Sequence, residues 1–410
     1  MPAPRRAAIV APCRTAVGRF GGSLAPLGAG ELGAAVLSAL VKRSGIDPGR
    51  VDDVVMAHGY ANGEAPAIGR WAWLAAGLPE SVPGYELDRR CGSGLQAVIN
   101  AAAMVQAGIS DVVVAGGVES MSNVEHYTTA VRGGVRMGDL TLHDRLTRGR
   151  LMSQPQARYG VISGMIETAE NLAADYGIGR EASDAYAVRS HQRAAAAWQA
   201  GRFADEIVPV AVPQKRGEPV MFDHDEGYRA DVSMESLGKL KAIEERTMPG
   251  AVVTAGNASQ QNDAAAACLV VAEDKLAELG LTPMLWFHSA AMAGCDPSRM
   301  GIGPVPATER LFARNGLAWD DIDLIELNEA FAPQVLAVLK GWGWSDDDSR
   351  HDTLNVNGSG ISLGHPIGAT GVRILATMAH EMARRGSRYG LETMCVGGGQ
   401  GVAAVFERAA

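Results

Sequence analysis

The chain has 410 residues, of which 47% are hydrophobic and 20% are charged, and its formal net charge is −9. A chain of this length and composition is expected to form two or three globular units around a large buried core. The acidic balance argues against a general nucleic-acid-binding protein and against a partner surface of anionic lipid. Since no window holds eighteen uninterrupted apolar residues, the sequence predicts no membrane span.

The five cysteines form neither a C-x-x-C pair nor a cluster with histidine. Their odd number and scattered positions argue against a disulfide framework and against a structural zinc site, and they predict free thiols in a reducing compartment. The first six residues lead directly into a strand-like segment, so we expect no signal peptide. The high glycine and alanine content, together with free thiols, favours a cytoplasmic location. Because the cysteines form no cluster with histidine, we also expect no bound metal.

In the first part of the chain, short branched runs alternate with longer runs rich in alanine and leucine. Strands are expected at residues 8–10, 51–56, 84–88 and 112–116, and helices at residues 31–41, 68–76 and 94–107. Alternation of this kind predicts a mostly parallel sheet with helices on both faces, which is the α/β fold class.

Residues 119–250 interrupt this alternation with long loops. Helices are expected at residues 167–176 and 181–200, and a hairpin at residues 207–222, so the segment is typical of an inserted lid. Residues 131–158 contain six arginines and two acidic residues. This local positive charge could bind an anionic ligand or an acidic neighbouring subunit, or it could belong to a solvated loop.

After the inserted segment the first series repeats. Strands are expected at residues 284–289, 322–326, 354–356, 393–396 and 402–406, and helices at residues 307–315, 333–339 and 368–383. The order matches that of the first part, so we interpret the chain as one unit used twice. This predicts a first half of residues 1–120 that is completed by about residues 250–275, an inserted domain of residues 121–249, and a second half of residues 276–410.

Two cysteines lie in glycine-rich surroundings that a ligand could approach. Cys91 stands where a strand meets a helix, and the positive end of a helix dipole favours the thiolate, so we interpret Cys91 as a nucleophile. Cys395 precedes a run of three glycines at the end of a strand. His365 stands near a helix start of the second half, in a position equivalent to that of Cys91. If the halves pack with pseudo-twofold symmetry, the two helix starts converge on one site.

Seven motifs in this order resemble those of the thiolases, and the resemblance covers nearly the whole chain. They are Cys91-Gly92-Ser93-Gly94-Leu95, Ala115-Gly116-Gly117-Val118-Glu119-Ser120-Met121-Ser122, Thr168-Ala169-Glu170-Asn171, Thr254-Ala255-Gly256-Asn257-Ala258-Ser259, Asn328-Glu329-Ala330-Phe331-Ala332, Gly364-His365-Pro366-Ile367-Gly368-Ala369-Thr370-Gly371 and Cys395-Val396-Gly397-Gly398-Gly399-Gln400-Gly401. The resemblance implies two βαβαβαββ halves in a five-layered α-β-α-β-α core. It also implies an acyltransferase of fatty acid metabolism that cleaves or forms 3-ketoacyl-CoA.

The resemblance further implies a role for each site residue. Cys91 would carry the acyl group, His365 would act as its base, and Cys395 would be the second acid/base. Asn328 and the backbone N–H of Gly397 would belong to two oxyanion holes. Coenzyme A, a substrate rather than a permanent cofactor, would lie near Ser259, Arg229 and Ser236. A homodimer or homotetramer is also implied.

Two other functions remain as alternatives. A decarboxylating ketoacyl synthase would share the duplicated fold and the cysteine at a helix start but would not require Cys395. A non-catalytic acyl-CoA or lipid-binding scaffold would require none of the reactive side chains. One departure from the thiolase pattern leaves the acyl substrate open, because residues 164–167 read Gly-Met-Ile-Glu where many biosynthetic thiolases carry a histidine.

Overall fold

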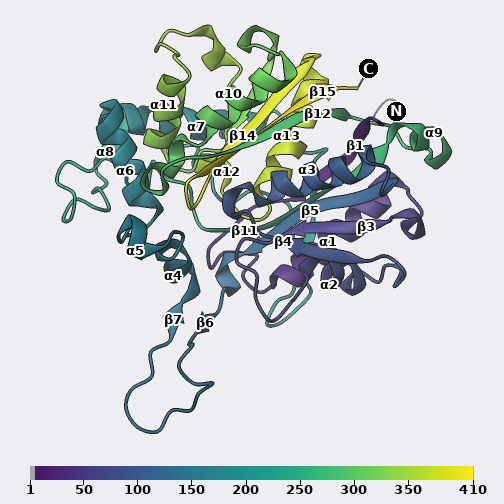
Figure 1. Cartoon of the computed structure of the whole chain (residues 1–410), viewed down its shortest axis with the longest axis horizontal. Coiled ribbons are helices and arrows are strands. Elements are labelled where there is room, and N and C mark those ends of the chain that lie inside the picture. Colours follow the sequence, from purple (N-terminus) through teal and green to yellow (C-terminus); the bar gives the residue numbers. More distant parts are fainter. Residues whose placement is uncertain (1–4, 410) are drawn as a thin grey trace.

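The computed structural model describes residues 5–409, and its centre is a mixed β-sheet (Figure 1). The main strands follow one another across the sheet in the order β13-β14-β15-β12-β1-β11-β5-β3-β4. Their bounds are β1 Ala7–Thr15, β3 Asp53–Ala57, β4 Gly84–Leu87, β5 Val112–Ser120, β11 Asn262–Ala272, β12 Leu285–Gly294, β13 Leu324–Leu327, β14 Tyr389–Val396 and β15 Gln400–Arg408.

The sheet consists of two arms with the same internal order. The first arm has the strand order β4-β3-β5-β11-β1, and the second has the order β13-β14-β15-β12. In the second arm Leu354 takes the place of β4, because it forms a parallel bridge to Ile325 of β13 just as β4 pairs in parallel with β3. Within residues 5–409, the strands of the two arms meet through two residue pairs between β1 and β12, Ala8 with Trp286 and Ile9 with Leu285. The predicted duplication is therefore confirmed.

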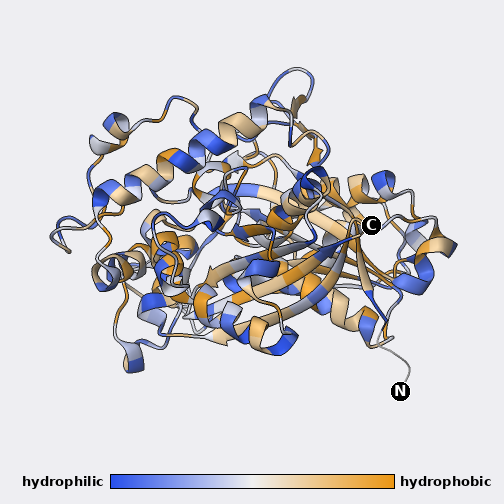
Figure 2. Cartoon of the chain, turned by 90° about the horizontal axis from the view of Figure 1, so that it is seen from above, coloured by the Kyte–Doolittle hydropathy of each residue, from blue (hydrophilic) through white to orange (hydrophobic). Residues whose placement is uncertain are grey.

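Helices form three layers around the two arms. α1 (Ala29–Ser44) and α2 (Ile68–Ala75) cover the first arm, and α10 (Pro304–Asn315) and α11 (Ala332–Gly341) cover the second. Between the arms, α3 (Ser93–Gln106) packs against α13 (Thr370–Arg385). This is the expected α-β-α-β-α arrangement, and Figure 2 shows that apolar residues dominate its central strands.

Strand β11 illustrates why the strands of this fold read as continuous apolar runs. All eleven of its residues are buried, because helices lie on both of its faces. Ala265, Ala267 and Leu269 face the α1 side, whereas Ala266, Cys268 and Val270 face α3 and α13. Side chains that alternate between two apolar layers give no polar alternation to mark the strand in the sequence.

The segment between β5 and β11 holds the short elements. These are β6 His126–Tyr127, β7 His143–Asp144, α4 Arg145–Leu151, α5 Gln156–Tyr159, α6 Met165–Tyr176, α7 Arg180–Gln199, β8 Ile207–Val208, β9 Val210–Val212, β10 Val220–Phe222 and α8 Met234–Gly238. Helices α6 and α7 pack on α11, so this segment covers the second arm. Figure 1 shows the residues between β6 and β7 as a loop that extends away from the rest of the chain.

The hairpin prediction for residues 207–222 is wrong in its first part. Only β9 and β10 pair as a hairpin, while Ile207 and Val208 run parallel to Arg14 and Thr15 of β1. Both residues of β8 are apolar and buried, so pairing with the large sheet removes them from water.

The remaining elements are β2 Gly18–Arg19, α9 Leu276–Leu279 and α12 Gly360–Leu363. None of the helices within residues 5–409 has the length and apolar character needed to cross a bilayer.

Candidate active site

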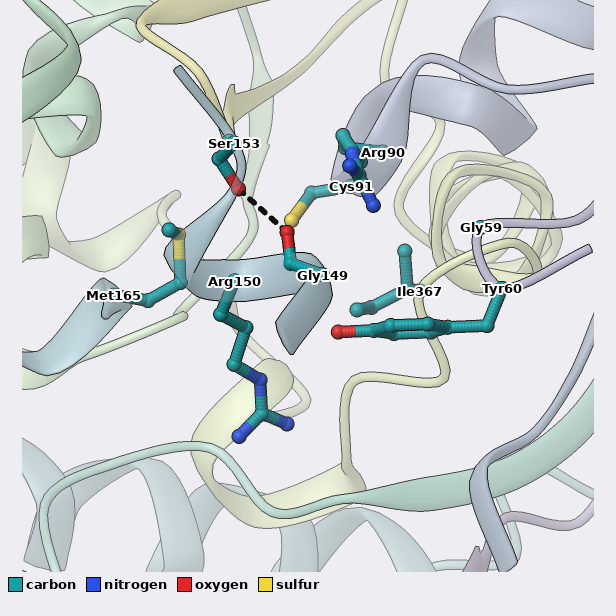
Figure 3. Close-up of a pocket in the computed structure, with 10 residues that line it drawn as sticks. Gly59, Tyr60, Arg90, Cys91, Gly149, Arg150, Ser153, Met165 and Ile367 are labelled. Carbon is teal, nitrogen blue, oxygen red and sulfur yellow. Dashed lines mark hydrogen bonds between the residues drawn. The ribbon is translucent and has the colours of Figure 1, made fainter. Parts of the chain in front are cut away.

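Cys91 lies in a tight turn, Arg90–Gly92, between β4 and the first residue of α3. The residue before it, Arg90, has φ of 49°, a left-handed conformation that is costly for a residue with a side chain. The turn directs the thiol into a pocket (Figure 3). The pocket is lined by Gly59, Tyr60, Arg90, Cys91, Gly149, Arg150, Ser153, Met165, Ile367 and Gly397.

The glycine run after Cys395 forms the turn that joins β14 to β15. Gly398 and Gly399 have φ of 85° and 83°, which side chains disfavour. A Cβ on Gly399 would also lie 2.4 Å from the carbonyl oxygen of Cys295. The turn brings the backbone N–H of Gly397 to the Cys91 sulfur, to which it donates a hydrogen bond. The structure therefore places the backbone N–H of Gly397 beside Cys91.

The structure corrects the expectation that the Cys91 thiol is ionised. Burial raises the pKa of the Cys91 thiol, although the N–H of Gly397 and the charge of Arg90 act in the opposite direction. Desolvation of a thiolate outweighs the stabilisation that a helix N-terminus offers. Cys91 is therefore a neutral thiol in the free protein and needs a base to become a nucleophile.

His365 can supply that base. Its Nδ1 lies 2.7 Å from the Thr370 hydroxyl, which in turn donates to the carbonyl oxygen of Pro366 at 3.1 Å. Because that hydroxyl hydrogen is used, Nδ1–H is assigned as the donor, and Nε2 keeps a free lone pair. Burial and the charges of Arg373 and Arg150 lower the pKa of His365 to about 3, so the imidazole is neutral at physiological pH.

The predicted equivalence of Cys91 and His365 is only approximate. Cys91 stands two residues before the first residue of α3, whereas His365 lies in the loop after α12, five residues before Thr370 begins α13. The helix starts themselves do meet. A Cβ on Gly94 would lie 2.8 Å from the backbone nitrogen of Gly371, so α3 and α13 touch backbone to backbone beside the site.

Asn328 lies directly after β13 and is fully buried. Its Nδ2 is 3.5 Å from both ring nitrogens of His365, which is at the outer limit of a hydrogen bond. Its Oδ1 has no hydrogen-bond partner among residues 5–409. The structure therefore places Asn328 beside His365, with polar atoms still available to a substrate.

Cys395 is fully buried in β14 and lies next to the pocket rather than in its wall. Burial raises the pKa of the Cys395 thiol well above its ordinary value, and the nearby sulfurs of Cys91 and Cys295 act in the same direction. A neutral thiol in a site without bulk water can give a proton to a carbanion at short range. The two catalytic candidates, Cys91 and Cys395, are therefore brought together.

The residues predicted to contact coenzyme A lie outside this pocket. Arg229 and Ser236 are exposed, and Ser259 is partly buried. Ser236 is the third residue of α8 and hydrogen-bonds Ser233 at its start, whereas the backbone N–H of Ser259 donates to the carbonyl oxygen of Ala330. None of the three lines the pocket around Cys91. Within residues 5–409, no group of three or more His, Cys, Asp or Glu side chains is arranged to hold a metal.

Three residues of the site were not singled out from the sequence. Tyr60 follows β3, and its place after the carboxyl end of a parallel strand is a signal that could have indicated it. Thr370 stands five residues after His365, but nothing in the sequence shows that its hydroxyl reaches the ring. Arg150 was only one of six arginines in its segment, and the fold alone brings it to Cys91.

Two buried thiols, a neutral imidazole and backbone N–H groups in a duplicated α/β fold define an acyltransferase that uses a cysteine nucleophile. Residues 7–274 match the family model for the thiolase N-terminal domain, and residues 281–408 match that for the thiolase C-terminal domain. The chain belongs to the thiolase family and is an acyltransferase.

Known proteins agree with this assignment over nearly the full length. The chain is 47% identical over 401 residues to an acetyl-CoA acetyltransferase of Chromobacterium violaceum, covering 98% of this chain and 99% of that one. The crystal structure of the Bacillus anthracis acetyl-CoA acetyltransferase superposes with a TM-score of 0.93 at 41% identity, covering all of both chains. The crystal structure of human mitochondrial 3-ketoacyl-CoA thiolase in complex with CoA superposes with a TM-score of 0.90 at 36% identity, covering 99% of this chain and 98% of that one. The ketoacyl synthase and scaffold alternatives are not favoured.

Proposed function

We propose that this thiolase exchanges acyl groups between coenzyme A thioesters, and that Cys91, His365 and Cys395 carry out the chemistry. The observation that supports the proposal most strongly is the proximity of two neutral thiols, Cys91 in the pocket wall and Cys395 beside it. The imidazole of His365, whose Nε2 is free, lies near Arg150, which lines the same pocket. One thiol serves as nucleophile and the other as acid/base, which a single cysteine could not do in the same step.

In the direction of cleavage, His365 takes the proton of Cys91 and the sulfur attacks the 3-keto carbon of 3-ketoacyl-CoA. The bond between the second and third carbons breaks, and its electron pair leaves as the enolate of acetyl-CoA. Cys395 gives this enolate a proton. The thiol of a second coenzyme A then gives its proton to the Cys395 thiolate and attacks the thioester on Cys91. The Cys91 sulfur leaves and takes its proton back from His365, so that a shortened acyl-CoA is released and all three side chains regain their starting states. Synthesis is the reverse of this sequence.

The two oxyanions formed along this path need separate hydrogen-bond donors. The backbone N–H of Gly397, which already points at the Cys91 sulfur, and the N–H of Cys91 would stabilise the tetrahedral intermediate. The thioester enolate would be stabilised at His365 and Asn328, whose side chains adjoin each other. Both assignments follow the thiolase pattern, and the positions of these groups in the structure support them.

The proposal also covers the coenzyme A contacts, the location and the assembly of the protein. Coenzyme A is a substrate, and Ser259, Arg229 and Ser236 contact it away from Cys91. The protein is cytoplasmic and forms a homodimer or homotetramer. It is divided into a first half of residues 1–120 completed by residues 250–275, an inserted domain of residues 121–249 and a second half of residues 276–410. The pairing of β11 between β1 and β5 supports this division, whose residues 1–4 and 410 lie outside the described part of the chain.

The roles of the two thiols are tested by comparing Cys91→Ala with Cys395→Ala. Cys91→Ala is expected to abolish formation of a covalent acyl-enzyme from acetyl-CoA, measured as a mass shift of the intact protein. Cys395→Ala should still acylate, but it should not exchange the methyl protons of acetyl-CoA with deuterated solvent. Proton exchange at the wild-type rate in Cys395→Ala would show that Cys395 is not the acid/base.

A further inference from the structure

Two guanidinium groups border the pocket that contains the reactive thiol. Arg90 precedes Cys91, and its side-chain Cβ and Cγ lie within 4 Å of the place that a Cβ on Gly397 would occupy. Its Nη1 lies 3.8 Å from the corresponding position on Gly149. Arg150 comes from α4 and reaches the pocket from the other side of Gly149 (Figure 3). Two positive charges thus flank the place where the acyl group is attached.

Neither of these guanidinium groups forms an ion pair within residues 5–409, although their neighbours have partners. Arg145, on the same helix as Arg150, pairs with Glu125, and Arg148 contacts the ring of His143. Arg89 donates to the side chain of Gln400. The arginines that face away from the pocket are therefore satisfied by the protein, whereas Arg90 and Arg150 keep donors for a ligand.

The carboxylates closest to the pocket are already occupied. Glu119 accepts the backbone N–H groups of Gly59, Tyr60 and Gly368. Asp88 accepts the backbone N–H of Arg90 rather than its side chain. Since the protein does not neutralise the two arginines, an anion that enters the pocket meets donors without having to displace a carboxylate.

The rest of the pocket wall is mostly apolar. Met165 and Ile367 line it, and the ring of Tyr60 packs with Met121 and Leu146 behind the wall. The charge of Arg150 also lies near the Tyr60 hydroxyl, whose pKa it acts to lower. An acyl chain in this pocket would have methylene groups against apolar side chains and a polar end against Arg150, an arrangement that does not suit a chain ending in a methyl group.

We propose that the preferred substrate is a 3-ketoacyl-CoA whose acyl chain ends in a carboxylate, bound by Arg150 and Arg90. This inference rests on the proposed function of the same site. An arginine and a carboxylate can form two parallel charge-assisted hydrogen bonds, which fixes the position of the chain end. The phosphates of coenzyme A offer similar chemistry, but the pantetheine arm separates them from the thioester sulfur, whereas the arginines lie beside Cys91.

The test compares two six-carbon substrates that differ only at the chain end, 3-oxohexanedioyl-CoA and 3-oxohexanoyl-CoA. For each, kcat/KM for thiolysis is measured, and the ratio of the two values is the selectivity for the carboxylate. The wild-type protein is expected to prefer the dioic substrate by about 10-fold or more. Arg150→Met should lower the ratio by about 10- to 100-fold, Arg150→Lys should lower it less, and Arg90→Met combined with Arg150→Met should lower it most.

Arg148→Met is the matched control, because it removes an arginine from the same helix that does not line the pocket; its ratio should equal that of the wild type. If the arginines bind the phosphates instead, Arg150→Met will raise KM for coenzyme A equally with both substrates and leave the ratio unchanged, which overturns the inference. A wild-type preference for the methyl-ended substrate also overturns it. Absence of thiolysis with both substrates and with acetoacetyl-CoA would instead refute the proposed function itself.

Discussion

At the scale of single residues, the site depends on side chains that hold His365 in one protonation state. Thr370 accepts from Nδ1 and passes its own hydrogen to Pro366, while Arg373, fully buried, donates to the carbonyl oxygen of Gly364 and places a positive charge near the ring. A neutral imidazole whose Nε2 lone pair is free is the form that a base requires. Thr370 is therefore a positioning residue rather than a group that touches the substrate.

Replacing Thr370 by valine should lower kcat by about 10- to 100-fold, because the ring loses the acceptor that selects its tautomer. Thr370→Ser keeps the hydroxyl and should restore most of the activity. The rate of Cys91 alkylation by iodoacetamide, measured from pH 5 to 9, gives a second readout, and its pH profile should change in Thr370→Val but not in Thr370→Ser. An unaltered profile together with normal kcat in Thr370→Val would contradict the role.

The candidate catalytic residues could be found in the sequence because local patterns mark them. Cys91 and Cys395 stand beside glycines that serve a turn or a close approach, and His365 stands in a similar run. Tyr60 and Arg150 carry no such mark. They are separated by ninety positions in the chain, and only packing of the inserted segment onto the first half brings them together.

At the scale of elements, the strands β13 and β14 carry an unusual pair of carboxyl groups. Glu326 and Glu392 are register partners, and both are fully buried near Arg373. Their side-chain oxygens have no hydrogen-bond partners among residues 5–409. Burial raises the pKa of Glu326 to about 8. Glu326 is thus an interior group that stays protonated near neutral pH, because an ionised carboxylate is costly to bury.

Glu326→Gln should change how stability depends on pH. In the wild type the unfolded carboxyl group ionises near pH 4.5 and the folded one only near pH 8, so the unfolded state loses its proton first and stability falls as pH rises between these values. Glutamine does not titrate. As pH rises across this window, the free energy of unfolding of the variant should therefore increase relative to that of the wild type by about 1.4 kcal/mol per pH unit.

Urea unfolding at pH 5 and pH 8 measures this difference, at one protein concentration throughout. Glu235→Gln, an exposed position on α8, serves as the control and should show no such growth. An equal difference at both pH values would mean that Glu326 is ionised in the folded protein.

The helices and strands were largely predictable from the sequence, since most of the predicted elements are present. Strand β11 was not identified because its two apolar faces leave no periodic pattern, and β8 was misassigned because its partner lies almost 200 residues away.

At the scale of the whole molecule, the loop between β6 and β7 stands away from the rest of the chain, and its residues 129–142 are all exposed (Figure 1). It carries large apolar side chains, and Met137 is 95% exposed. Others are Val131, Val135, Leu140 and Leu142. Apolar side chains gathered on one protruding loop are typical of a contact with another protein.

Replacing residues 130–140 by a short Gly-Ser linker should therefore reduce the size of the oligomer. Light scattering coupled to size-exclusion chromatography gives the mass directly, and a smaller mass than that of the wild-type oligomer is the expected result. A control variant that replaces residues 215–217, in the loop between β9 and β10, by the same kind of linker should keep the wild-type mass. If the loop variant also keeps that mass, the loop is not a subunit contact.

The meeting of α3 and α13 at Gly94 and Gly371 has a consequence for how this protein can change over time. No side chain separates the two backbones there, so even one methyl group on either glycine would push the starts of the two helices apart. Each repeat thus constrains the mutations that the other can accept. Although the chain contains two copies of one ancestral pattern, the copies must evolve as a single unit at this point.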